Sequence, residues 1–122
     1  MSVRTRFSDL TLLPIALLML FALPLSAAPP SLFYSLLPLK HGQATCMKRA
    51  YATLASEVSG KIDKRADNVS LVNDDFNIGV HCRETGKNTS FATIVVAHRA
   101  SFDEARGVAL NIRRGMETGI IE

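Results

Sequence analysis

The sequence predicts an α+β fold of two layers, in which two helices lie on one face of a small antiparallel sheet. Three observations lead to this prediction: an apolar stripe with helical spacing after residue 43, strand patterns between 69 and 97, and a second helical stripe after residue 101. The expected order is helix, short strand, strand, strand, helix, which packs most simply as a meander beneath two helices. With 122 residues the chain has room for one domain, which we place at 43–122.

Residues 1–27 have the three-part pattern of an export signal. Arg4 and Arg6 precede an uncharged apolar run over 10–25, and small residues follow at 26–28. Cleavage after Ala27 is favoured over cleavage after Ala28, which would leave a proline immediately downstream. The sequence therefore predicts an exported protein, either periplasmic or extracellular.

An uncleaved membrane anchor is the alternative interpretation of the same segment. A spanning helix needs about 20 apolar residues, whereas the run over 10–25 is shorter and contains two prolines. No charge follows until Lys40, but consecutive prolines interrupt the uncharged stretch as a helix. Under this alternative the protein is a membrane-anchored accessory subunit, and only then does it contact a membrane.

Residues 28–42 are apolar and contain three prolines, so we expect an irregular leader there. The leader is too apolar for a simple linker, and it either lies across the domain or docks on another surface. Its large apolar side chains are Leu32, Phe33, Tyr34, Leu36, Leu37 and Leu39.

The first helix is expected over 43–58, where apolar residues recur at steps of three and four. Gly60 stands where a residue in the left-handed conformation commonly ends a helix. The charged residues over 61–68 are expected to form a connection. The apolar stripe of this helix consists of Met47, Ala50, Tyr51, Leu54 and Val58.

Three strands are expected next. Residues 69–72 form a short first strand, and 76–83 alternate apolar and polar side chains with a period of two. Turn residues over 85–89 follow, and then an apolar, β-branched strand over 91–97. If the hairpin turn centres on Lys87, Cys82 lies opposite Ala92.

This register divides the hairpin into two faces. A slip of one residue would exchange the faces of one strand. The face of Cys82 also holds Phe76, Ile78, Val80, Ile94 and Val96, whereas the second face holds Asn77, His81, Arg83, Phe91, Thr93, Val95 and Ala97.

The second helix is expected from Ser101 to about Glu117. Ser101 and Glu104 have the spacing of a capping box, in which the serine side chain and the glutamate satisfy exposed backbone donors. The apolar stripe of this helix consists of Ala105, Val108, Ala109, Ile112 and Met116.

The two cysteines, Cys46 and Cys82, are expected to form a disulfide, since both lie in the exported part of a small chain. Cys46, near the start of the first helix, can reach Cys82 from the layer above the sheet. A bridge that closes the loop between Cys46 and Cys82 stabilises the folded protein by about 3–4 kcal/mol, because it lowers the entropy of the unfolded chain. Two buried free thiols are the alternative.

The sequence gives little support to catalysis, to a cofactor or to a metal site. His81 and Cys82 are neighbours on a strand and point to opposite faces, so they are poorly placed to share a metal ion. No motif of a nucleophilic enzyme occurs. The formal net charge is only +3 and there is no tryptophan, which argues against nucleic acid as a partner. We therefore expect a non-enzymatic protein that needs no cofactor.

Two features suggest an interaction surface that binds a protein partner or a second copy. One is the leader around Phe33 and Tyr34, and the other is the second hairpin face. The alternative is that the leader packs over that face and closes the core. A small-ligand site or an enzyme site on the hairpin face is a further alternative. The hairpin residues expected in the surface are His81, Arg83, Phe91 and Val95.

Overall fold

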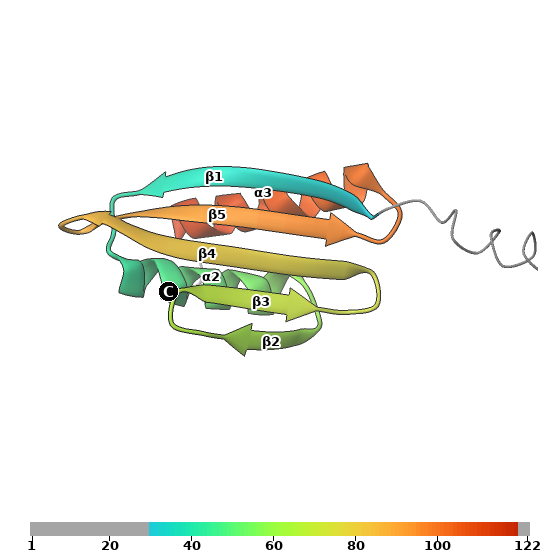
Figure 1. The fold of residues 1–122 in the computed structure, drawn as a ribbon, viewed down its shortest axis with the longest axis horizontal. Helices are drawn as coiled ribbons and strands as arrows, with labels where there is room; N and C mark the ends of the chain where they lie inside the picture. Colours follow the sequence, from blue (N-terminus) through green and yellow to red (C-terminus); the bar gives the residue numbers. More distant parts are fainter. Residues whose placement is uncertain (1–29, 120–122) are drawn as a thin grey trace, which may run out of the picture.

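The computed structural model describes residues 30–119, which form a five-stranded antiparallel sheet with two helices on one of its faces (Figure 1). The expected signal, its cleavage positions and the last three residues lie outside the described range. The elements are β1 (Ser31–Leu39), α2 (Gln43–Glu57), β2 (Lys61–Lys64), β3 (Asn68–Val72), β4 (Phe76–Gly86), β5 (Thr89–His98) and α3 (Phe102–Thr118).

The sheet order is β1-β5-β4-β3-β2, so strands β2 to β5 form a meander in chain order and β1 adds to its far edge. The predicted hairpin register is confirmed, because Cys82 lies opposite Ala92. The residues expected on the Cys82 face point to the helices: Ile78, Val80, Ile94 and Val96 are fully buried, and Phe76 packs against them.

Strand β1 corrects the expectation of an irregular leader. It pairs along its whole length with β5, from Ser31 opposite His98 to Leu39 opposite Ser90. Alternate side chains of β1 point to the helices, among them Leu37, which is buried. Pro38 is tolerated because β1 is an edge strand, where a proline without an N–H need not interrupt the pairing.

Strand β2 corrects the expected charged connection over 61–68. Its four residues pair with β3, and Ile62 packs against the core between charged neighbours. Gly60 does not end α2 in a left-handed conformation, because the helix ends at Glu57 and the cap residue Val58 is already extended. A Cβ at Gly60 would lie 2.8 Å from the carbonyl oxygen of Val72, so glycine permits a close backbone approach there.

Helix α2 buries a stripe that is rotated from the expected one. Met47, Ala50 and Leu54 are buried as predicted, but Tyr51 is 45% exposed. Thr53 is buried instead, because its side of α2 packs against α3.

Helix α3 follows the prediction closely. The Ser101 side chain accepts a hydrogen bond from the Glu104 N–H at 3.2 Å, as half of the expected capping box. At the other end, Arg49 from α2 donates to the carbonyl oxygens of Met116 and Glu117, at 2.9 and 3.4 Å. The C-terminal partial charge of α3 is therefore met by an arginine of the neighbouring helix.

The predicted disulfide joins Cys46 of α2 to Cys82 of β4, with both residues fully buried. Gln43, one turn earlier in α2, donates a hydrogen bond to the Cys82 carbonyl oxygen at 2.9 Å. The bridge and this bond together fix the first turn of α2 to the centre of the sheet.

Candidate functional site

The sheet face opposite the helices has no covering layer among the described residues, and we call it the open face (Figure 1). Three large apolar side chains of β1 lie on it: Leu32 is 55% exposed, Tyr34 64% and Leu36 46%. The side chains that β5 and β4 add to the open face are those of Phe91, Thr93, Val95, Ala97, Asn77, His81 and Arg83.

The open face is arranged in rows that cross the strands. In the central row, Tyr34 of β1 pairs with Val95 of β5, Val95 pairs with Gly79 of β4, and Gly79 pairs with Ser70 of β3. Tyr34, the most exposed apolar side chain of this face, therefore lies two strands from Gly79, which has no side chain.

A shallow hollow of about 240 Å³ lies over Gly79. A Cβ at Gly79 would meet no atom within 4 Å, so the hollow results from the missing side chain. Val95 provides an apolar wall, whereas Asn68, His81 and Thr93 provide polar groups. The hollow can receive one side chain of moderate size.

His81 is held at the rim of this hollow by Asp67, with 3.1 Å between its Nε2 and the carboxylate oxygen. The Asn68 side chain also donates to the Asp67 carboxylate at 3.0 Å. These two hydrogen bonds, the one from His81 first, lower the pKa of Asp67 from its ordinary value. His81 is thus a positioned polar group at the edge of the apolar surface.

Charge is distributed unevenly over the sheet. Strand β1 has no charged residue, and β5 has none between Thr89 and Ala97. Lys61, Asp63 and Asp67 lie instead on β2 and on the connection to β3. The open face therefore has an apolar half at β1 and β5, and its charges lie towards β2 and the connection between β2 and β3.

The structure brings together five of the six residues expected in an interaction surface: Tyr34, His81, Arg83, Phe91 and Val95 lie on the open face. Phe33 points to the other face, where its ring packs edge to face on Phe102 at 5.7 Å. Sequence reasoning missed the hollow, although the glycine in an alternating strand was the signal for it.

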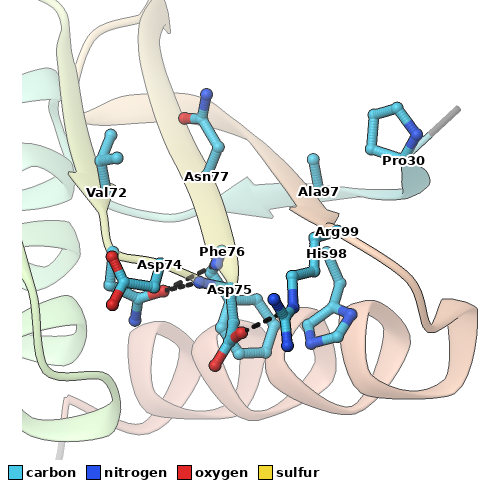
Figure 2. Close-up of a pocket in the computed structure, with 10 residues that line it drawn as sticks. Pro30, Val72, Asp74, Asp75, Phe76, Asn77, Ala97, His98 and Arg99 are labelled. Carbon is cyan, nitrogen blue, oxygen red and sulfur yellow. Dashed lines mark hydrogen bonds and ion pairs between the residues drawn. The ribbon is translucent and has the colours of Figure 1, made fainter. Parts of the chain in front are cut away.

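A second hollow, of about 260 Å³, lies at the end of the sheet near Pro30 and Phe76 (Figure 2). Several of its polar groups already have partners within the molecule. Arg99 pairs with Asp75 at 3.0 Å, and His98 Nδ1 accepts hydrogen bonds from the N–H groups of Ala100 and Ser101. The His98 ring also packs edge to face on Phe76 at 4.7 Å, as a structural histidine at a strand end.

Within residues 30–119, no three or more potential metal ligands gather in one place. Neither helix of that range has the length and apolar composition needed to cross a bilayer. Comparisons with known protein families, curated proteins and solved structures find no match for this chain.

Proposed function

We propose that this protein is exported from the cytoplasm and acts without catalysis, by binding a protein through the open face of its sheet. The observation that carries the proposal is the exposure of Leu32, Tyr34 and Leu36 on one strand of an uncovered face. Removing apolar surface from water is favourable by about 25 cal/mol per Å², from which the costs of association are subtracted. Tyrosine is also enriched at interfaces, because it combines an apolar ring with a polar tip.

The composition of the open face supports a protein partner. Its apolar half is bordered by polar groups, among them His81 and Arg83, and this combination is typical of an interface core with its rim. Strands β4 and β5 are paired on both sides and the edge strand β1 is paired along its whole length with β5, so the backbone of the surface is ordered before binding. An ordered surface loses little conformational entropy when it binds.

The Cys46–Cys82 disulfide supports export, since such bonds form and persist in oxidising compartments. The apolar run over 10–25 after two arginines supports it independently. An intact mass of the recovered protein, before and after reduction and alkylation, tests both. We expect a chain that starts near Ala28 and gains two alkyl groups only after reduction.

Site-specific photo-crosslinking tests the binding surface. A photoreactive amino acid placed at Leu36, on the open face, is expected to give an adduct with a protein. The matched position is Leu110 on α3, which is 37% exposed on the other layer. Adducts of equal yield at both positions, or none at position 36, would contradict the proposal.

The hollow over Gly79 supports a second candidate function, binding of a small ligand near His81 and Thr93. Its volume of about 240 Å³ is below the range of roughly 300–1,000 Å³ for small-molecule sites. We therefore place the protein partner first. Ligand binding that is lost on His81→Ala while the position-36 adduct persists would favour the second candidate.

A further inference from the structure

We propose that the partner of the open face is a second copy of this chain. The two open faces pack against each other about a two-fold axis that runs along β5 near Val95. Tyr34 of each copy then inserts into the hollow over Gly79 of the other. This inference rests on the proposed function, since it names the protein that the open face binds.

The central row of the open face is complementary to itself. Tyr34 and Gly79 flank Val95 on either side, and neighbouring strands lie about 4.8 Å apart. A half-turn about an axis along β5 exchanges the two flanks. Tyr34 therefore lies over the hollow of the other copy, and the reverse contact forms at the same time, as a two-fold interface requires.

The other face-to-face axis lacks this fit. An axis along the row, across the strands, would put Tyr34 over Tyr34 and Gly79 over Gly79. Two exposed Tyr34 rings would then meet while two hollows stayed empty, whereas the axis along β5 stacks the partly buried Phe91 and Val95 side chains of β5 on their own copies. Both axes keep the strands of the two sheets nearly aligned, as sheets commonly pack, so the fit of Tyr34 into the hollow is what distinguishes them.

The chemistry of the hollow suits a tyrosine. The ring would lie against Val95 and the bare backbone of Gly79, while the hydroxyl reaches the polar wall of Asn68, His81 and Thr93. A buried tyrosine hydroxyl needs such a partner.

The charge distribution fits the same arrangement. The axis along β5 stacks β1 of one copy on β4 of the other, so the interface covers β1, β5 and β4. Strand β2 falls outside it, so Lys61 and Asp63 remain in water, whereas β3 contributes only the uncharged Asn68 to the hollow. The charged side chain that the interface does cover is that of Arg83, opposite Phe91 near the hairpin end of β4. Its long stem lets the guanidinium stay in water at the border of the contact.

The free edge of β1 is a poorer site for a second copy than the open face. Arg113 Nη1 of α3 donates to the Leu36 carbonyl oxygen at 2.8 Å and to the Ser35 hydroxyl at 3.0 Å. Pro38 has no N–H that could donate a hydrogen bond to an added strand. A charged side chain and a proline on an edge strand are devices that prevent edge-to-edge pairing.

The size of the contact predicts a weak dimer. Three strands of about nine residues cover a footprint of roughly 30 by 14 Å, or about 400 Å² per copy. Stable complexes bury about 800 Å² per partner. We therefore expect a reversible dimer that is populated as the protein concentration rises towards about 1 mM.

Sedimentation of the protein expressed from the full sequence, between about 10 µM and 1 mM, tests the inference. A Cβ at Gly79 would meet no atom within 4 Å, so we expect Gly79→Val to keep the fold, to fill the hollow and to lower the association constant by at least about tenfold. Tyr34→Ala has a similar effect. The matched control is Tyr51→Ala, on the helix layer, which leaves the association constant within about twofold. A monomer throughout this range, or a dimer insensitive to Gly79→Val, overturns the inference.

Chemical cross-linking tests the axis itself. Val95→Cys places a thiol beside the axis in each copy, and sheets pack about 10 Å apart, so a bismaleimide of about that span joins the two copies. Ser70→Cys lies in the same row two strands further on, and its two thiols are too far apart to be joined. Equal cross-linking of both variants overturns the axis. A position-36 photo-adduct that contains a different protein leaves the proposed function standing while removing the self-partner, whereas no adduct removes both.

Discussion

A Cβ atom on Gly115 would lie 2.7 Å from the Cγ2 atom of Thr53, so α3 approaches α2 closely where a glycine faces a buried threonine. Gly107, two turns earlier in α3, is exposed, and a Cβ there would meet nothing within 4 Å. The same helix thus contains one glycine required by packing and one that is not.

The two glycines are expected to respond to alanine with opposite signs. Gly115→Ala should lower the free energy of unfolding by about 1–3 kcal/mol through overpacking against Thr53. Gly107→Ala should raise it by up to about 1 kcal/mol, because alanine favours a helix over glycine. Urea denaturation of both variants measures the difference. Equal shifts would mean that α3 does not approach α2 at Gly115.

Removal of the disulfide should destabilise the protein only when the bridge can form. Cys46→Ser is expected to lower the free energy of unfolding by about 3–4 kcal/mol under oxidising conditions. With a reductant present, wild type and variant should melt at similar temperatures. Melting curves with and without reductant test this, and an unchanged difference under reduction would contradict the entropic contribution of the bridge.

The cap of α3 should be measurable on its own. Ser101→Ala removes the acceptor for the Glu104 N–H and is expected to cost about 1 kcal/mol of stability. Ser59→Ala is the matched control, because only the backbone oxygen of Ser59 receives a hydrogen bond, from Asn73. Thermal unfolding of the two variants should separate them, and identical melting temperatures would argue against the cap.

His98 should contribute to stability through its ring nitrogen. His98→Leu keeps an apolar contact with Phe76 but removes the acceptor for the N–H groups of Ala100 and Ser101. We expect a loss of about 1–2 kcal/mol. Arg99→Ala, which breaks the neighbouring exposed ion pair with Asp75, should cost less than about 1 kcal/mol. A larger loss of stability for Arg99→Ala than for His98→Leu in chemical denaturation would show that the ion pair, and not the histidine, stabilises the turn between β5 and α3.

The pH dependence of Asp67 follows from its two hydrogen bonds. Its pKa is lowered, so the folded state favours the carboxylate, and the contribution to stability is present at neutral pH and lost as the pH falls through the lowered pKa. His81→Ala should raise the pKa of Asp67 towards its ordinary value, and by more than Asn68→Ala does. Carboxyl titration by NMR measures both shifts, and the opposite order would assign the effect to Asn68.

Much of the fold could be predicted because its signals are local. The alternation over 76–83 and the turn before Thr89 fixed the register of β4 on β5, and the Ser101 cap located the start of α3. The same reasoning missed β2, because three of its four residues are charged and only Ile62 reaches the core.

Strand β1 was missed for a different reason. Its alternation is hidden in sequence because both faces carry leucines and aromatic rings, so Phe33 and Tyr34 look alike although they point to opposite layers. Its partner β5 also lies far along the chain, and such pairing leaves no local pattern. The hollow over Gly79 is lined by residues of β3, β4 and β5, which no single segment of sequence shows together.

The pairing of Ser31 with His98 joins the first described strand to the last, and it therefore determines when the sheet can close during folding. A chain that emerges from its amino end delivers β1 first, yet the strand that receives β1 arrives almost last. Before β5 is made, β1, an uncharged strand rich in leucine, has no strand to pair with, although Cys46 and Cys82 have both been synthesised. Closure of the sheet is therefore a late event with high contact order, and the interval before it is when this protein most needs protection from its own copies.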